Sequence, residues 1–365
     1  MSQTPSATPA LHLDGVMLPS GERTGVWIVD GAMTFTPVAD ATTIASEVWI
    51  MPGLVDAHCH VGLGAEGAVA ADVAEQQAIT DRNAGTLLIR DAGSPIDTHW
   101  LDAQADKPRI VRAGRHIARP KRYIRNFAAE VEPEQLVAEV AHQAVRGDGW
   151  VKLVGDWIDR EVGDLAPLWP YETAKAAIDE AHRLGARVTA HCFEEESVQQ
   201  LVRAGIDGVE HGTGLDADTI ELMAAGQVAL VPTLINLENF PIFADAGRAK
   251  FPRYADHMLA LHRRRRETIG AAIEAGVPVY AGTDAGGTLP HGLISSEVGL
   301  LAELGGVEFA LGAASWRARQ WLGAETAGEG ESADLVVYAA DPRLDPAVTA
   351  HPKMVILRGS VVFHS

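Results

Sequence analysis

The chain has 365 residues, of which 47% are hydrophobic and 22% charged, and its formal net charge is −19. This length and composition are typical of a globular protein with a full core, so we expect one large α/β domain plus a small appendage. The acidic balance argues against a nucleic-acid or anionic-membrane partner, because both require a basic surface.

The N-terminal stretch MSQTPSATPALHLDG lacks a basic region followed by an apolar run. No later stretch approaches the roughly 18 uninterrupted apolar residues of a membrane span. We therefore expect no signal peptide, no membrane partner and a cytoplasmic location. Residues 11–36 then read as short strands separated by turns.

From residue 48 onward, predicted strands alternate with predicted helices. Stretches such as 133–147 and 171–185 have apolar residues at three- and four-residue spacing and end in glycine, which is typical of helices. Eight such units in about 270 residues match a (β/α)₈ TIM barrel, and a doubly wound sheet is the structural alternative. The predicted strands are 49–61, 86–93, 109–118, 150–156, 186–193, 208–212, 229–236 and 277–286.

The C-terminal part again reads as strands. After a helix that ends near Gly323, residues 333–341 and 351–365 are rich in β-branched and apolar residues. We therefore predict an N-terminal part (1–47) and a C-terminal part (326–365) of one small β-sandwich, with the barrel at 48–325 between them.

Six candidate metal ligands fall at the ends of predicted strands. His58 and His60 in VDAHCH are separated by one residue, so on a strand both imidazoles point to the same face and can bind one ion. Each residue alone has an ordinary explanation, such as a hydrogen-bonded core histidine or a helix N-cap. Barrel active sites gather at the C-terminal ends of the strands, so we expect all six to converge there. The remaining candidates are Lys152, His191, His211 and Asp284.

Four imidazoles and a carboxylate suit zinc, and less exclusively iron, manganese or nickel. The ammonium group of Lys152 is a poor neighbour for a dication. A lysine with a lowered pKa can instead react with carbon dioxide to form a carbamate, an anionic oxygen ligand able to bridge two ions. Cys59 and Cys192 each adjoin one of the histidines. Strand alternation turns them outward, so we expect buried, reduced thiols and neither a disulfide nor metal ligation.

This ordered set of residues resembles the amidohydrolase superfamily over essentially the whole chain. The matching elements are the His-X-His of VDAHCH, VKLV, VTAH, VEHG and GTDAG, followed by the tail EGESADLVVYAADP. Their contexts are similar to prolidase-like and Xaa-Arg-type dipeptidases and to imidazolonepropionase relatives. The resemblance implies that His58, His60 and Asp284 hold the first metal and His191 and His211 the second, with carboxylated Lys152 bridging them.

The activity that the resemblance implies is metal-dependent hydrolysis of a C–N amide bond in a small molecule. The expected substrates are a dipeptide, an N-acyl amino acid or a cyclic amide, with Asp284 as metal ligand and general acid/base. The alternatives are a mononuclear deaminase or imidazolonepropionase-like hydrolase with an unmodified Lys152, cleavage of esters or lactones, and a catalytically inactive barrel scaffold. The metal count, one or two zinc ions, and a homo-oligomeric state stay open.

A basic segment, residues 115–125, follows the third predicted strand and is expected near the barrel mouth. An arginine there is suited to bind a substrate carboxylate, whereas the alternative is a solvated surface loop. The prolidase-like relatives usually carry a Gly-Gly-His element here, and this chain has RPKRYIRNF instead. The predicted substrate-binding residues are Arg119, Arg122, Tyr123, Trp157 and His291.

Overall fold

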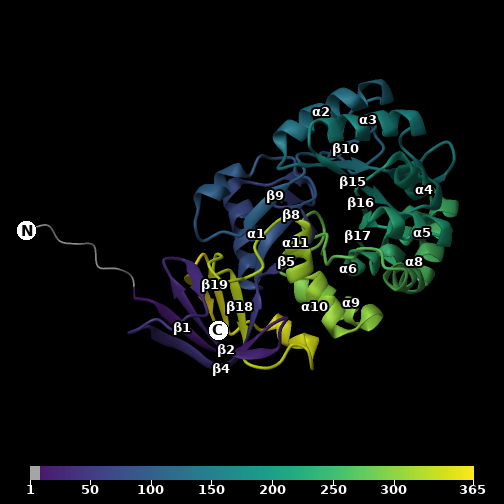
Figure 1. The fold of residues 1–365 in the computed structure, drawn as a ribbon. Helices are drawn as coiled ribbons and strands as arrows, with labels where there is room; N and C mark the ends of the chain where they lie inside the picture. The colour runs from purple at the N-terminus through teal and green to yellow at the C-terminus, as the bar shows by residue number, and fades with distance from the viewer. Residues whose placement is uncertain (1–8) are drawn as a thin grey trace, which may run out of the picture.

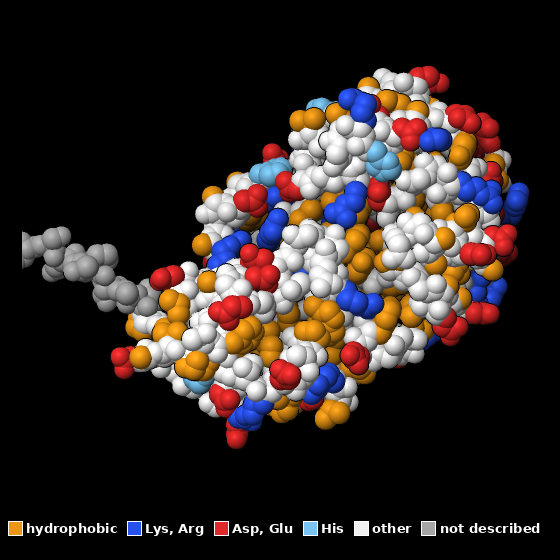
Figure 2. Space-filling view, viewed as in Figure 1, with side chains coloured by type: hydrophobic (Ala, Val, Ile, Leu, Met, Phe, Trp, Pro, Cys, Tyr) orange, Lys and Arg blue, Asp and Glu red, His pale blue; other side chains and the backbone are white. Residues whose placement is uncertain are grey.

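The computed structural model describes residues 9–365, and residues 1–8, the start of the predicted segment 1–47, lie outside the described part. A ring of strands surrounded by helices lies beside a separate sheet, in which purple N-terminal strands adjoin yellow C-terminal strands (Figure 1). No helix within the described residues is long and apolar enough to cross a membrane. Acidic and basic side chains are interspersed over the face shown in Figure 2.

The wall of the ring consists of parallel strands whose side chains are almost all buried, which explains their continuous apolar sequences. Two hydrogen-bonded groups, β5-β8-β9 and β12-β15-β16-β17, make up most of the wall. Their bounds are β5 (Leu54–Cys59), β8 (Thr86–Asp91), β9 (Arg109–Arg112), β12 (Trp150–Val154), β15 (Arg187–Cys192), β16 (Gly208–His211) and β17 (Ala229–Val231).

Residues 277–285 close the ring between β17 and β5. The amide of Tyr280 donates to Leu230 O at 3.0 Å, and the amide of Ala57 donates to Ala281 O at 2.8 Å. On the opposite side, the amide of Asp148 donates to Arg112 O at 2.8 Å and joins the two groups. The predicted (β/α)₈ barrel is thereby confirmed over a doubly wound sheet, because an open sheet would leave two unpaired edges.

The helices cover the outside of the ring (Figure 1). At the start of α4, the carboxylate of Glu194 accepts the amides of Glu196 and Ser197. The helices are α1 (Ala71–Asn83), α2 (Leu136–Arg146), α3 (Tyr171–Arg183), α4 (Glu195–Ala204), α5 (Ala217–Gly226), α6 (Leu234–Leu237), α7 (Phe240–Arg248), α8 (Pro252–Glu274), α9 (Ile294–Gly305), α10 (Val307–Ala313) and α11 (Trp316–Trp321), with short 3₁₀ turns at His99–Ala103, Pro133–Gln135 and Pro346–Ala350.

Strands from both chain ends form one sheet outside the barrel, and in residues 9–365 its order is β20-β19-β18-β4-β1-β2-β3. Its buried core includes Leu13, Val26 and Ile356. The strands are β1 (Leu11–Met17), β2 (Glu22–Val29), β3 (Ala32–Thr34), β4 (Thr42–Pro52), β18 (Leu335–Tyr338), β19 (Met354–Leu357) and β20 (Ser360–His364). Short strands elsewhere are β6 (Leu63–Gly64), β7 (Gly67–Ala68), β10 (Ile117–Ala118), β11 (Ala129–Glu130), β13 (Asp156–Asp159) and β14 (Asp164–Pro167).

Four predicted strands differ from the observed ones. The eighth, 277–286, forms only isolated bridges to its neighbours, at residues such as Val279 and Ala285, and not a continuous strand. The first was expected to run without a break from residue 49, but β4 ends at Pro52 in the outer sheet and β5 begins at Leu54. The third, 109–118, is divided into β9 and β10. The seventh, 229–236, ends at Val231, and α6 begins at Leu234 because the carboxylate of Glu297 accepts the first amides of this helix.

Both cysteines are buried and free, in agreement with the prediction. Cys59 packs in a cluster that includes Ala74 and Ala78 of α1, and Cys192 packs in the main core between strands and helices.

Candidate metal centre

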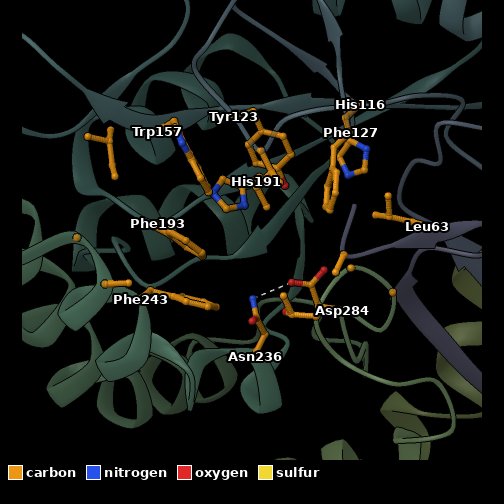
Figure 3. A pocket seen from close by; sticks show the side chains of 18 of the residues that line it. Leu63, His116, Tyr123, Phe127, Trp157, His191, Phe193, Asn236, Phe243 and Asp284 are labelled. Carbon is orange, nitrogen blue, oxygen red and sulfur yellow. Dashed lines mark hydrogen bonds between the residues drawn. The ribbon is translucent and has the colours of Figure 1, made fainter. Parts of the chain in front are cut away.

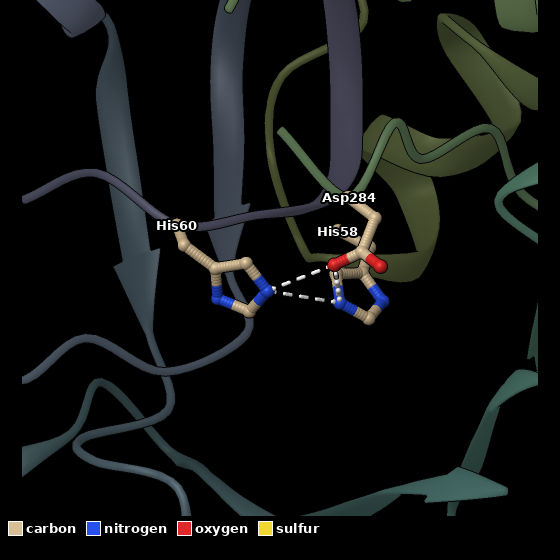
Figure 4. Close-up of side chains that lie close together, drawn as sticks. All are labelled: His58, His60 and Asp284. Carbon is tan, nitrogen blue, oxygen red and sulfur yellow. Dashed lines mark hydrogen bonds and ion pairs between the residues drawn. The ribbon is translucent and has the colours of Figure 1, made fainter. Parts of the chain in front are cut away.

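Three of the candidate ligands point at one another at the ends of β5 and of residues 277–284. Asp284 Oδ1 lies 3.0 Å from Nε2 of both His58 and His60, and these two nitrogens are 3.3 Å apart (Figure 4). The three residues form a group able to hold a metal ion. The site fits such an ion, because a ligand distance of about 2.1 Å spaces neighbouring donor atoms about 3.0–3.4 Å apart.

The other ring nitrogen of each histidine has a partner that orients it. His60 Nδ1 donates to Gly93 O at 2.7 Å, and His58 Nδ1 donates to Glu210 Oε2 at 2.7 Å. Glu210 in turn pairs with Arg90 at 2.5 Å, and both side chains are fully buried. These contacts leave both Nε2 atoms directed at Asp284, which is the arrangement that metal-binding histidines require.

The remaining three candidates lie on β12, β15 and β16, three strands that follow one another in the barrel wall. The ring centroid of His211 is 5.3 Å from that of His58 and 4.7 Å from that of His191. Lys152 on β12 is 1% exposed and stands in register with Thr189 on β15. The structure thus brings the six together, with Lys152 in the middle of β12 and the other five at or near the ends of their strand segments. Among the described residues, only His58, His60 and Asp284 of the six form one tight cluster.

Two of the six have a left-handed backbone at the point where their strand ends. The φ angle is 68° at His211 and 59° at Asp284. This conformation is costly for residues other than glycine and concentrates at functional sites. His211 Nδ1 also lies 2.7 Å from Thr233 Oγ1, which limits the rotation of its ring.

Burial decides the protonation of most of these groups. It lowers the pKa of His60, lowers that of His191 well below its usual value, and lowers that of His211 to about 3, so these rings are neutral near pH 7. Burial also lowers the pKa of Lys152. For Asp284, burial favours the neutral acid, but His58 and His60 outweigh it and hold the pKa well below its usual range.

His58 is the exception among the imidazoles. Burial and Lys152 oppose its protonation, but the carboxylates of Glu210 and Asp284 outweigh them and raise its pKa. Glu210 itself is ionised, since Arg90 and His58 outweigh burial and hold its pKa well below the usual range. A dication bound here would take the place of the proton on His58, and its positive charge would stabilise the ionised carboxylate of Asp284.

His191 supplies a further observation in favour of a ligand-binding role. Its Nε2 is buried and has no hydrogen-bond partner within residues 9–365, and the nearest acidic oxygen, Asp156 Oδ1, is 3.8 Å away. An unsatisfied buried nitrogen is expensive, so neutral imidazoles in such a setting suit metal binding.

A cavity of about 460 Å³ opens over this centre and is lined mainly by aromatic and apolar side chains (Figure 3). His60, His191 and Asp284 form part of its floor. Its aromatic wall consists of Tyr123, Phe127, Trp157, Phe193, Phe243, Phe251 and Tyr254.

The predicted substrate-binding residues divide into two groups. Tyr123 and Trp157 line the cavity, with ring centroids 4.8 Å apart, whereas Arg119, Arg122 and His291 are not part of its lining. The two arginines are engaged elsewhere: Arg119 with Glu132 at 3.4 Å, and Arg122 with Asp159 at 2.7 Å.

His291 lies on the other side of the first strand. Its Nδ1 is 2.7 Å from Asp81 Oδ2, and its side chain is buried. Asp81 Oδ1 also accepts the amide of Gly292, and this pair of contacts anchors the loop before α9 to α1.

Sequence reasoning missed Asn236, because residues 229–236 were read as one strand. Asn236 Nδ2 donates to Asp284 Oδ2 at 2.7 Å (Figure 3). The other oxygen of this carboxylate, Asp284 Oδ1, faces His58 and His60. The one-turn helix α6 therefore carries a partner for Asp284, and Thr233, just before it, contacts His211. The signal available was Pro232, because proline is unusual within a central strand.

Two further lining residues were also missed. His116 is buried beside His60, with ring centroids 4.9 Å apart, and burial lowers its pKa well below the usual value. Lys250, between α7 and α8, belongs to the lining as well. His116 stands within the RHIA end of a predicted strand, but nothing in the local sequence distinguishes Lys250.

Known proteins share both the sequence and the fold. A Mycobacterium tuberculosis protein described as uncharacterized is 59% identical over 351 residues, which are 96% of this chain and 95% of that protein. Ochratoxinase of Aspergillus niger is 28% identical over 241 residues, covering 63% of this chain and 49% of that enzyme.

Two solved structures share the fold. A Xaa-Pro dipeptidase with bound methionine has a TM-score of 0.83 at 22% identity, covering 98% of this chain and all of that one (100%). Aspergillus niger ochratoxinase has a TM-score of 0.80 at 19% identity, and the match covers 98% of this chain and 96% of that one. The amidohydrolase family model matches residues 49–362. With a match over most of its length, the chain belongs to the amidohydrolase family.

Proposed function

We propose that this protein hydrolyses a C–N amide bond in a small molecule with the help of bound divalent metal, and that the substrate is a dipeptide, an N-acyl amino acid or a cyclic amide. The observation that carries this proposal is the group His58, His60 and Asp284, whose donor atoms converge below a cavity that His60 and Asp284 line. Family membership supports it, as do relatives named ochratoxinase and Xaa-Pro dipeptidase.

Two zinc ions are the proposed cofactor. His58, His60 and Asp284 would hold one ion, His191 and His211 the other, and Lys152 would bridge them as its N6-carboxylate. The lowered pKa of Lys152 supports this, because the neutral amine is the form that reacts with carbon dioxide. The alternative is one metal, and it is supported by the fact that only the first three ligands form a tight cluster within residues 9–365.

A bound divalent ion would lower the pKa of water and polarise the substrate carbonyl. Asp284 is ionised and is held in one orientation by Asn236, so it is positioned to accept the proton of the attacking water. It then returns this proton to the leaving nitrogen. The neutral rings of His191 and His211 leave lone pairs free for ligation.

The decisive experiment counts bound metal in the purified protein and in Lys152→Ala, and measures turnover on a panel of amides. We expect about two zinc ions per chain, a loss of metal in the variant, and at least a 100-fold loss of kcat, because a bridging ligand serves both ions. Lys175→Ala is the matched control, since this exposed lysine on α3 pairs only with Asp179 among the described residues.

A second measurement tests the carbamate directly. Protein equilibrated with ¹³C-bicarbonate should give one carbamate carbon resonance that Lys152→Ala abolishes and Lys175→Ala retains. One metal ion per chain, unchanged in Lys152→Ala, would exclude the bridge and favour a mononuclear deaminase or imidazolonepropionase-like enzyme. Full metal occupancy without turnover of amides, esters or deamination substrates would instead favour an inactive scaffold.

A further inference from the structure

The cavity above the candidate metal centre contrasts strongly with the acidic surface of the molecule. Seven of its lining residues are aromatic, and Figure 3 shows several of these rings directed into the cavity. Aromatic walls bind flat apolar groups by stacking and by burial of area. A cavity of about 460 Å³ lies within the range that accommodates a compound with one or two ring systems.

Charge is nearly absent from this lining. Within the described residues, Asp284 is its one carboxylate and Lys250 its one lysine or arginine side chain. Asp284 is already engaged by His58, His60 and Asn236. A cationic substrate group therefore has no free carboxylate as partner in the cavity, whereas an anionic group has the ammonium of Lys250.

The turn between α7 and α8 sets the position of Lys250. The amides of Lys250 and Phe251 both donate to Gly247 O, at 3.1 and 2.8 Å. The ring of Tyr254 packs against Gly247 so closely that a Cβ there would lie 2.7 Å from its Cε1. The base of the lysine is thus held firmly, while its long side chain stays free to reach a ligand.

The ammonium group of Lys250 has no acidic partner of its own. Its Nζ lies 5.2 Å from the ring centroid of Phe251, and it forms no salt bridge within residues 9–365. Arg248, two residues earlier, differs in this respect because it pairs with Asp256 at 3.0 Å. The net charge of −19 repels anions at long range, but screening limits that effect to about 8–10 Å, so a cation in the lining dominates locally.

We propose that the substrate carries a bulky aromatic group, bound by the aromatic wall, and a carboxylate, bound by Lys250. Lys250 is then a specificity-determining residue, and the carboxylate-binding role that the sequence suggested for Arg119 and Arg122 belongs to the α7–α8 turn. This inference rests on the proposed amide hydrolysis and names its substrate class: N-aroyl amino acids and related aromatic amides with a free carboxylate.

The test uses three amides and the zinc-loaded protein. N-(2-naphthoyl)-L-phenylalanine has both features, N-(2-naphthoyl)-2-phenylethylamine lacks only the carboxylate, and N-acetyl-L-alanine lacks the aromatic groups. We expect kcat/KM of the wild type to be about tenfold higher for the first than for either of the others, because a charge-assisted contact and a buried ring each contribute on that scale.

Lys250→Met should lower kcat/KM about tenfold for naphthoyl-phenylalanine and leave naphthoyl-phenylethylamine unchanged, whereas Lys250→Arg should keep most of the preference. Arg248→Met, at the end of α7 and outside the cavity, should leave all three values of kcat/KM unchanged. Equal effects of Lys250→Met on both naphthoyl amides, or no effect on either, would overturn the role of Lys250. Equal rates for naphthoyl and acetyl substrates would overturn the aromatic class.

Calorimetric binding of naphthoyl-phenylalanine separates this inference from the proposed function. If the zinc-loaded protein hydrolyses none of the amides, the proposed amide hydrolysis is wrong. The dissociation constant of naphthoyl-phenylalanine still tests whether Lys250 binds the carboxylate. We expect it to rise about tenfold in Lys250→Met and not in Arg248→Met. A dissociation constant that Lys250→Met leaves unchanged, or no binding at all, would overturn the inference.

Discussion

At the scale of single residues, the candidate site depends on pairs in which one member faces the metal position and the other holds it. His58 is held by Glu210, His60 by the carbonyl of Gly93, and Asp284 by Asn236. Such supporting contacts fix the tautomer of an imidazole and the rotamer of a carboxylate, so their loss weakens a site without removing any ligand.

Asn236→Ala tests this directly. The variant frees Asp284 Oδ2, so the carboxylate can rotate away from the orientation suited to proton transfer, and we expect kcat to fall about 10- to 100-fold with a smaller change in KM. Metal content should stay within a factor of two of wild type, which distinguishes positioning from general damage. Asn239→Ala, three residues further along the chain, is the control. A kcat equal to that of wild type in Asn236→Ala would contradict the role of Asn236.

At the scale of secondary-structure elements, short segments between barrel strands and helices carry most of what is specific to this site. The turn from Thr233 to Asn236 contacts two candidate ligand residues and is anchored by Glu297 on α9. Helix α8 is tied to its neighbours through His257, which lies 3.0 Å from both Asp164 of β14 and Glu195 of α4. These contacts join elements that are far apart in sequence.

The His257 bridge predicts a dependence of stability on pH. Glu195 and Asp164 raise the pKa of His257 from 6.5 to about 9, against the effect of burial. Because the folded-state pKa lies above the unfolded one, the stabilisation is complete below about pH 6.5 and is lost as pH rises through about 9. The ring is about one-fifth exposed (22%), so we expect a contribution of about 1–2 kcal/mol, well under the full shift.

Urea denaturation of wild type and His257→Gln at several pH values between 6 and 10 would measure this contribution. The difference in unfolding free energy between the two proteins should be largest at pH 6 and should decline towards pH 10. A difference that is constant over this range, or that grows with pH, would show that the bridge does not act through the imidazolium charge.

At the scale of the whole molecule, the two chain ends support the first barrel strand. Strand β4 leads through Gly53 directly into β5, which carries His58 and ends one residue before His60. The Gly53 amide donates to Asp334 O at 2.8 Å, and the carbonyl of Gly53 accepts from Arg319 Nε at 2.9 Å. The outer sheet and α11 therefore meet at one junction just before the candidate ligands.

Arg319→Met should lower the unfolding free energy by about 2–4 kcal/mol. Arg319 is 2% exposed, and the variant leaves the carbonyls of Gly53 and Glu325 without their donor. Chemical denaturation gives the measurement. Arg23→Met is the control, since the Arg23–Asp14 pair lies on the surface and should contribute under 1 kcal/mol. Equal stability of the two variants would show that the junction is not a major support.

The barrel, the outer sheet from both chain ends and the placement of the six candidate ligands on or next to barrel strands were all predictable from the amino-acid sequence. These properties are local: a buried strand needs a continuous apolar run, an amphipathic helix needs its periodicity, and residues i and i+2 share a strand face. In a (β/α)₈ barrel the C-terminal ends of the strands meet at one end of the barrel, and this rule implied that the candidate ligands lie close together. The strand predicted for residues 229–236 failed because Glu297, more than 60 residues away, caps the turn that begins there.

Only the tertiary structure decided which loop side chains line the cavity and which hydrogen-bond partners orient the candidate metal ligands. Tyr123 lines it but Arg122, its neighbour, pairs with Asp159, and Lys250 reaches it from a turn that no motif marks. These outcomes depend on contacts between segments far apart in the chain and on competition among partners for each charge. Short-range sequence patterns contain no information about such long-range contacts or about this competition. The sequence alone therefore determined the barrel fold and the order of the candidate ligands along the chain, whereas tertiary packing determined which side chains line the cavity.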